Sequence, residues 1–385
     1  MEVLHTVYVS KAEVDFENVD LADVEKRNSY ALKTPTCTLP LLETNEGNVS
    51  ESIAIELYLA KKNDKNLLGA NALENAKINQ WIEFASCEIK RCLKAIIYPV
   101  FGWSCYCKDT ANKENENLKK YIKVLENTLK GNKYLLGDRL TLADIVLFRY
   151  LRFLMMFHFP DGMRKNVLPN TSKWFENIMK TPEAVKAYGR TVLCKMPVKA
   201  YVGEKPCGGK KEEKKETKKE NKKEEKKEKK DEEEEEPKVK KKNPLDLLPP
   251  SSMDLEAFKR AFLNNKDKKD AMEKFWQVYD PEGYSLYWVE YQNLPTECKV
   301  LYRTSNAKSM FLQKMDTLRR YAFAAHGVYG TEGDYKIRGV WMMRGKDIPQ
   351  EFKDNDYFEY LTVRKLDPTI EQDKQLVNDY WTKVN

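Results

Sequence analysis

The chain has 385 residues, of which 33% are charged, and its formal net charge is +7. This length favours two or three domains over a single hydrophobic core. No run of about 18 uncharged apolar residues occurs, which argues against a membrane span, and no Gly-x-x-x-x-Gly-Lys-Ser/Thr loop occurs, which argues against nucleotide hydrolysis.

The N-terminus and the cysteines predict a cytoplasmic protein. The first six residues carry neither a basic start nor a long apolar run, so no secretion signal is expected. The eight cysteines show no regular spacing, which in a chain of this size favours free thiols in a reducing compartment. Because the three histidines lie far apart in the sequence, no metal site is expected.

Apolar residues at helical spacing predict that residues 50–200 are mostly helical. Ser50 is expected to cap a helix that runs through Ile53–Ala60. Two further stripes follow, and they consist of Ile78, Trp81, Ile82, Phe84, Ala85, Ile89 and Leu93, and of Leu118, Tyr121, Ile122, Leu125 and Leu129.

The segment Tyr134–Ile145 predicts a loop that leads into a capped helix. Thr141 and Asp144 have the spacing of a capping box, in which each side chain bonds the backbone amide of the other residue. Residues 145–159 are apolar on nearly every side, which is typical of a helix inside a domain. Arg149 and Arg152 interrupt the apolar run.

Residues 210–242 predict an extended, solvated linker. They contain 16 Lys and 13 Asp or Glu and no aromatic residue, so they cannot bury enough apolar surface to offset the entropy of the chain. Like charges recur four residues apart, as in Lys210 and Lys214, which disfavours an isolated helix. Binding of an anionic partner such as RNA by the lysine pairs is the weaker interpretation, since glutamates are interleaved.

A second domain is expected over about 252–385. Leu255, Phe258 and Phe262 predict an early helix, and Ser285–Tyr291 and Gly339–Met343 predict strands. Asp280–Gly283 has the Pro and Gly positions of a type I turn. Residues 275–291 hold seven aromatic residues, which form either a stacking platform for bases or, as we favour, a core rich in Tyr and Trp.

The motifs of the first half resemble the glutathione transferase fold. The matching pieces are Tyr134–Ile145, Thr38–Glu43 and Ser50–Ala54. The resemblance implies a cis proline at the end of a thioredoxin-like part and a Glu-Ser pair that receives the γ-glutamyl end of glutathione. The residues carried over to this glutathione-like pocket are Leu39, Pro40, Glu51 and Ser52. Glutathione is therefore a possible ligand, although no cofactor is required.

One departure from the transferase pattern concerns catalysis. Only 39 residues precede Pro40, where the family has about 60, so Val3–Val9 is either a first strand or a remnant of the following helix. No residue is assigned to stabilise a glutathione thiolate, and Ser10 is a candidate by position alone. Tyr8 and Cys37 are expected to be buried or rim side chains.

The second half resembles the gamma subunit of eukaryotic translation elongation factor one. The matching pieces are Asn243–Pro249, Phe275–Leu286, Met315–Phe323, Ile337–Gly345 and Arg364–Pro368. The order of a transferase-like domain, a Lys/Glu linker and this module also matches that family.

The resemblance implies a multidomain protein in four parts. They are a truncated thioredoxin-like α/β subdomain (1–50), an all-helical transferase-like subdomain (51–205), a disordered charged linker (206–242) and a C-terminal α+β domain (243–385). The two folded bodies are expected to move independently of each other.

The function that the resemblance implies is that of a non-catalytic scaffold in the elongation factor one complex. The transferase-like domain would dock the beta subunit, which exchanges guanine nucleotide on the GTP-binding alpha subunit that carries aminoacyl-tRNA. Two alternatives remain at this point: an active glutathione transferase with a C-terminal interaction module, and a nucleic-acid-binding module over 243–385.

Overall fold

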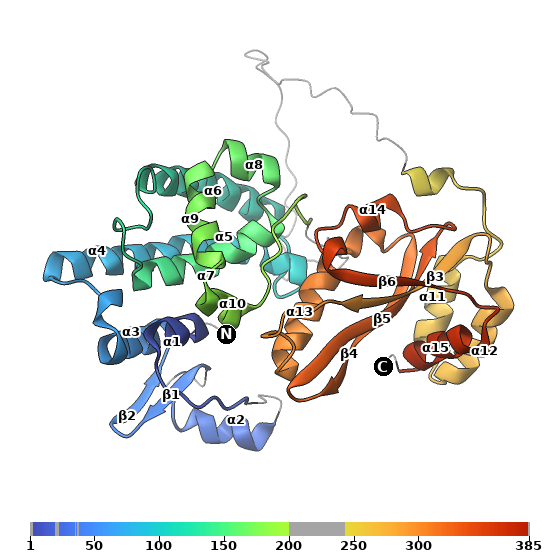
Figure 1. The fold of residues 1–385 in the computed structure, drawn as a ribbon, viewed down its shortest axis with the longest axis horizontal. Helices are drawn as coiled ribbons and strands as arrows, with labels where there is room; N and C mark the ends of the chain where they lie inside the picture. The colour runs from blue at the N-terminus through green and yellow to red at the C-terminus, as the bar shows by residue number, and fades with distance from the viewer. Residues whose placement is uncertain (1–2, 20–22, 35, 37, 200–242, 384–385) are drawn as a thin grey trace, which may run out of the picture.

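The computed structural model describes residues 3–19, 23–34, 36, 38–199 and 243–383. They form a mostly helical N-terminal domain and a C-terminal α+β domain that lie side by side (Figure 1). The linker predicted over 206–242 lies outside the described residues. Among the described helices, none combines the length and the apolar character that crossing a membrane requires.

The first part of the N-terminal domain contains helices and a hairpin. Its elements are α1 (Leu4–Ser10), α2 (Val24–Ala31), β1 (Leu41–Thr44), β2 (Gly47–Ser50) and α3 (Ser52–Asn63). Val7 of α1 packs in a small buried cluster with Ile55 and Leu59 of α3. Leu4 is also buried, and residues three apart share one face of a helix. For Val3–Val9 the helix is therefore confirmed and the strand is wrong.

The rest of the N-terminal domain is helical, as the apolar spacing predicts. Its elements are the 3-10 helix η1 (Lys65–Leu67), α4 (Ala72–Glu83), the π-helix η2 (Phe84–Ile89), α5 (Lys90–Ile96), the 3-10 helix η3 (Tyr98–Phe101), α6 (Lys108–Thr128), α7 (Leu142–Phe157), α8 (Asp161–Asn166), α9 (Pro169–Met179) and α10 (Pro182–Tyr188).

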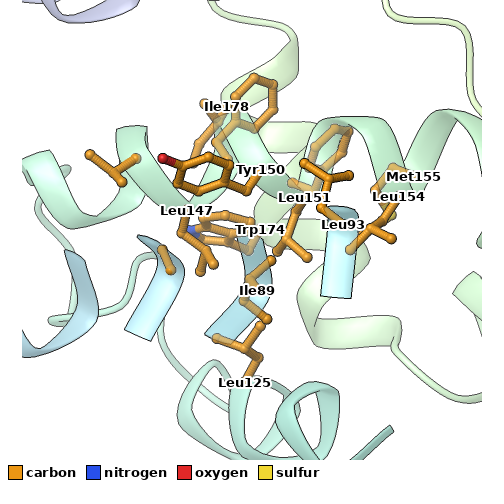
Figure 2. Close-up of a cluster of buried hydrophobic side chains, with 14 of the residues drawn as sticks. Ile89, Leu93, Leu125, Leu147, Tyr150, Leu151, Leu154, Met155, Trp174 and Ile178 are labelled. Carbon is orange, nitrogen blue, oxygen red and sulfur yellow. The ribbon is translucent and has the colours of Figure 1, made fainter. Parts of the chain in front are cut away.

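Helix α7 is the centre of this domain. All of its residues are buried except Phe153, which is partly buried. Figure 2 shows side chains of α7 among residues from η2, α5, α6 and α9, with Ile89, Leu125 and Trp174 around them. Full burial of each large apolar side chain contributes about 1.5–3 kcal/mol, so the apolar run from 145 onward places this helix inside the domain.

The C-terminal domain is built on a four-stranded antiparallel sheet of order β4-β5-β3-β6. Its elements are the 3-10 helix η4 (Pro244–Leu247), α11 (Leu255–Asn264), α12 (Lys268–Val278), β3 (Tyr284–Tyr291), α13 (Leu301–Lys314), the 3-10 helix η5 (Asp316–Leu318), β4 (Ala322–Thr331), β5 (Asp334–Arg344), α14 (Gln350–Lys353), the 3-10 helix η6 (Phe358–Tyr360), β6 (Leu361–Leu366) and α15 (Glu371–Trp381). The predicted early helix and both predicted strands are confirmed.

Helices cover both faces of this sheet, as Figure 1 shows. Successive strand residues point to opposite faces. Leu286 packs with α11, α12 and α15, whereas Tyr287 and Val289 pack with α13 and α14 on the other face. All seven aromatic side chains in 275–291 are buried or partly buried. The aromatic residues therefore form a core, and the stacking platform is wrong.

Buried histidines predict a loss of stability in acid. His5 is fully buried against the edges of Phe148 and Tyr188, and burial together with the charge of Arg149 lowers its pKa to about 3. Between pH 6.5 and about 3 the unfolded chain binds a proton at this position that the folded chain does not bind. The free energy of unfolding should then fall by at most about 1.4 kcal/mol per pH unit as the pH decreases.

The measurement is urea unfolding of the full chain at a series of pH values below 6.5. His5→Phe keeps a ring of similar shape and should flatten the pH dependence relative to the parent chain. Parallel curves for the two proteins would show that His5 contributes nothing to the acid sensitivity.

Candidate functional site

The hairpin β1–β2 gathers the residues predicted for a glutathione-like pocket. Leu41 pairs with Ser50 at the open end of the hairpin. The two residues before Leu41 and the two after Ser50 therefore flank this open end. These four residues are Leu39, Pro40, Glu51 and Ser52. The Leu39–Pro40 peptide bond is cis, as the resemblance implies.

The Glu-Ser pair stands at the start of α3. Glu51 is exposed and has φ 69° and ψ 123°, and Ser52 is the first residue of the helix. The Glu51 side chain does not cap the helix, so amides of the first turn remain available to an anion such as a carboxylate. The predicted cap at Ser50 is wrong, because Ser50 belongs to β2. Binding of glutathione here stays a prediction.

Ser10, the candidate for stabilising a thiolate, is the last residue of α1. The residue is 4% exposed, and its hydroxyl donates to the carbonyl of Val7 at 3.4 Å. A buried hydroxyl that bonds its own helix is poorly placed to meet a thiol from solvent. Tyr8 is partly buried beside the ammonium of Lys186, which lies 4.4 Å from its ring centre. Cys37 lies outside the described residues.

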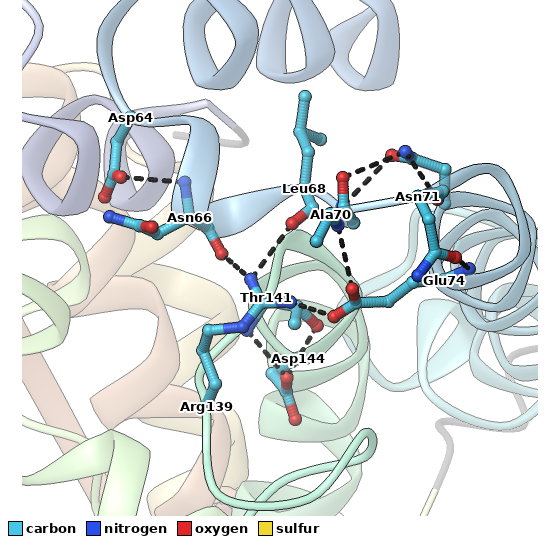
Figure 3. Close-up of polar contacts among 11 residues, drawn as sticks. Asp64, Asn66, Leu68, Ala70, Asn71, Glu74, Arg139, Thr141 and Asp144 are labelled. Atoms are coloured by element: carbon cyan, nitrogen blue, oxygen red, sulfur yellow. Dashed lines mark hydrogen bonds and ion pairs between the residues drawn. The ribbon is translucent and has the colours of Figure 1, made fainter.

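The predicted capping box at Thr141 and Asp144 is present (Figure 3). The amide and the hydroxyl of Thr141 donate to one carboxylate oxygen of Asp144, at 3.0 and 2.9 Å. The other oxygen accepts from the amide of Leu135 and the indole of Trp174, both at 2.9 Å. Asp144 is fully buried, and burial raises its pKa against the opposing effect of these hydrogen bonds. Asp144 thus joins the preceding loop, α7 and α9.

Arg139, in the same loop, connects it to the start of α4 (Figure 3). Its guanidinium donates to the carbonyls of Asn66 and Leu68 and pairs with Glu74. Glu74 also accepts from the amide of Ala70 at 2.8 Å, and this bond together with Arg139 holds the pKa of Glu74 below its usual range. The loop before α7 therefore holds the start of α4 in place, a role that its sequence did not reveal.

The two arginines that interrupt α7 have different surroundings. Arg149 pairs with Glu56 of α3 at 2.8 Å, and both side chains are buried. The hydroxyl of Thr6 donates to the same Glu56 oxygen at 2.9 Å. Arg152 instead donates to Thr191 Oγ1 at 2.9 Å, where the two domains meet. Charges inside an apolar helix signal buried partners, but only the fold identifies them.

The segment that follows α10, residues 189–198 and called the strap below, contacts the C-terminal domain. Val192 of the strap is buried in the core of the C-terminal domain. In the opposite direction, Met310 of α13 packs with the core of the N-terminal domain. Each domain therefore buries an apolar side chain of the other.

A buried ion pair holds the strap in place. The ammonium of Lys314 lies 2.6 Å from Asp356 and donates to the carbonyl of Val192 at 3.1 Å. The second oxygen of Asp356 accepts from the amide of Lys195 at 3.0 Å. Burial lowers the pKa of Lys314, and the Asp356 charge opposes this effect. The pair belongs to the C-terminal domain, and it bonds the backbone of the strap on both sides.

Further contacts surround the end of α10. Arg303 of α13 donates to the carbonyls of Lys186 and Ala187, both at 2.8 Å. The amide of Arg190 donates to Glu297 at 2.5 Å, and its guanidinium donates to a carbonyl of the C-terminal domain. The expectation that the two folded bodies move independently is therefore wrong, because the described residues of the two domains share buried apolar and polar contacts.

Comparison with known proteins assigns both halves of the chain. Residues 240–347 match the family model described as elongation factor 1 gamma, conserved domain. Residues 93–182 match the glutathione S-transferase, C-terminal domain. Among solved structures, the GST-like domain of elongation factor 1-gamma from Saccharomyces cerevisiae aligns with 51% of this chain and 91% of its own, at 22% identity and a TM-score of 0.45.

Relatives match along nearly the whole chain. A probable elongation factor 1-gamma 1 from Arabidopsis thaliana is 35% identical over 92% of this chain and 85% of its own length. Elongation factor 1-gamma from Prunus avium is 37% identical over 94% and 87%, and that from Rattus norvegicus is 31% identical over 92% and 85%. Since these matches run through both domains, the chain belongs to the elongation factor 1-gamma family of translation elongation factor subunits.

Proposed function

We propose that this chain is a non-catalytic scaffold of the elongation factor one complex and that its N-terminal domain docks the guanine-nucleotide-exchange subunit. The observation that carries the proposal is the family match through both domains, which includes the elongation factor 1 gamma domain at 240–347. The partner performs the exchange that returns GTP to the aminoacyl-tRNA carrier. The complex acts in the cytoplasm.

The site geometry supports a role without catalysis. The residues at the open end of the β1–β2 hairpin offer backbone and a helix start, but Ser10 is buried and bonded within its own helix. Transferase chemistry needs a group that depresses the pKa of the glutathione thiol. We therefore assign no catalytic residue and no required cofactor to this chain. In a steady-state assay, the chain should conjugate glutathione to a generic electrophile no faster than the background reaction. The Ser10→Ala variant should show the same rate.

The domain junction shapes how such a scaffold works. The strap fixes the C-terminal domain against the N-terminal domain through Val192, Lys314 and Asp356. A partner that docks on the N-terminal domain is then held at a defined position relative to the C-terminal domain. The scaffold therefore sets the orientation of the docked partner relative to the C-terminal domain as well as its distance.

The docking proposal predicts that the full chain and the exchange subunit elute together in gel filtration. Lysine cross-linking of the purified pair should join the exchange subunit to residues 3–199 rather than to 243–383. Both domains carry exposed lysines, for example Lys119 and Lys274, so a difference in cross-linking reports proximity and not the availability of lysines.

Asp356→Ala provides the matched control. This substitution disturbs the domain junction and replaces no side chain of residues 3–199, so the exchange subunit should still co-elute. Separate elution of the parent chain and the exchange subunit would refute the docking proposal. Cross-links confined to the C-terminal domain would reassign the docking surface.

A further inference from the structure

A cavity of about 50 Å³ lies at the junction of the two domains. The end of α7, the start of the strap and the C-terminal domain all line it, and the charged residues among them are Arg152, Arg190, Glu297, Lys299 and Arg303. Thr296, Lys299 and Asn306 are exposed where they line the cavity, so it communicates with solvent. Its volume has room for roughly three or four water-sized groups.

In the part of the chain that the structure describes, the cationic side chains around this cavity form no salt bridge with a carboxylate, although the charge of Glu297 acts on Arg152. Among the described residues, none of Arg152, Arg190, Arg303 and Lys299 forms a salt bridge. Arg152 donates to Thr191 Oγ1 at 2.9 Å and to the Tyr188 carbonyl at 3.4 Å. The guanidinium groups of Arg190 and Arg303 donate to backbone carbonyls, at 2.8 Å in each bond.

The single carboxylate of the cavity is already occupied by other donors. Glu297 accepts from the amides of Arg190 and Leu294 at 2.5 and 2.7 Å. Both of its oxygens also accept from the hydroxyl of Tyr291, at 3.3 and 3.2 Å. Among the described residues, four cations therefore line the cavity with one carboxylate, and this carboxylate forms no salt bridge with a guanidinium.

Arg152 is the group that most needs a counter-charge. Its side chain is buried, with 3% of the residue exposed, and a guanidinium stays protonated in a protein. The rings of Tyr188 and Phe153 lie 5.2 and 5.9 Å from it. Aromatic faces attract a cation but do not neutralise it. A buried charge without an ion-pair partner is unfavourable, and a small anion in the adjoining cavity would relieve this.

We infer that the junction cavity is a binding site for a phosphate group, either as free inorganic phosphate or as the terminal group of a small phosphate ester. Guanidinium groups match the geometry of phosphate oxygens, and a doubly charged oxyanion suits several cations that approach from two domains. Because both domains line the cavity, a bound phosphate bridges them and stabilises the docked arrangement.

The test is calorimetric titration of the full chain with inorganic phosphate and, separately, with glycerol 3-phosphate, at constant ionic strength maintained with chloride. One saturable site per chain is expected. Arg152→Met keeps a long apolar stem and removes the charge, and it should weaken binding roughly tenfold or more, as loss of a charge-assisted hydrogen bond does. Tighter binding of the ester than of inorganic phosphate would identify the ester as the ligand class.

Two further variants guard against misfolding and non-specific charge effects. Lys299→Gln changes an exposed residue at the cavity mouth, so it should fold normally and still weaken binding. Arg320→Met removes an exposed arginine outside the cavity, paired with Asp246 at 3.7 Å, and should leave binding unchanged. Absence of a saturable signal with both probes would overturn the assignment, as would equal weakening by Arg320→Met and Lys299→Gln.

Discussion

Replacing Asp144 with alanine is expected to destabilise the N-terminal domain by at least about 3 kcal/mol, because three buried donors lose their acceptor at about 1–3 kcal/mol each. The donors are the amides of Leu135 and Thr141 and the indole of Trp174. Such a loss is a large fraction of the total stability of a typical domain. Urea unfolding of the full chain should show a lower midpoint. Hydrogen exchange in α7 and α9 should accelerate most.

Two comparisons separate burial from capping. Asp144→Asn retains one acceptor oxygen and should give an intermediate loss. Asn71→Ala removes the exposed cap of α4, where Asn71 accepts from the amide of Glu74 at 2.9 Å, and should cost about 1 kcal/mol. If Asp144→Ala lowered the stability no more than Asn71→Ala does, the bonds that Asp144 accepts from these three donors and from the Thr141 hydroxyl would contribute no more than an exposed cap.

Replacing Asp356 with alanine should destabilise the protein by about 3–5 kcal/mol, the usual effect of removing one partner of a buried ion pair. Lys314 would remain buried without its carboxylate, and the amide of Lys195 would lose its acceptor. The strap should then detach. With a protease site placed in residues 206–242, the two halves of the cleaved parent chain should co-elute, whereas the halves of the variant should separate.

A double variant distinguishes a loss of folding stability from a loss of the contact between the two domains. Lys314→Met with Asp356→Leu replaces the buried pair with apolar groups, which restores much of the folding free energy but not the bonds to Val192 and Lys195. Its halves should still separate. For an exposed pair, Glu176→Ala removes the partner of Lys180 and should change stability by less than about 0.5 kcal/mol. Co-elution of the cleaved Asp356→Ala halves would contradict the assigned role of this pair.

The docked arrangement also changes how the Lys/Glu segment is interpreted. Its composition predicts a linker between two independent bodies. The composition, however, describes residues 206–242 alone. The contacts that join the domains come from residues 189–198 and from α13, outside the charged segment. Composition can show that a segment does not pack, but it gives no information on whether the domains on either side contact each other.

Local patterns in the sequence determined a large part of the fold. The apolar run from 145 onward predicts α7, and the Thr141–Asp144 spacing predicts its cap, because both depend on residues within one or two helical turns. The alternation in β3 and the turn at Asp280–Gly283 likewise depend on neighbours, and the amide of Gly283 bonds the carbonyl of Asp280 at 3.2 Å. The family resemblance correctly placed the cis bond before Pro40.

Only the tertiary structure decided the partners of the buried polar groups. Trp174 bonds Asp144 over a separation of 30 positions, and Arg149 bonds Glu56 over 93 positions. The strap bonds Asp356 over 161 positions. A local pattern can signal that such a group is buried, because a charge in an apolar helix requires compensation. It cannot name the compensating residue, since chain folding over tens of residues selects it. The cationic cavity at the domain junction depends on the same long-range placement.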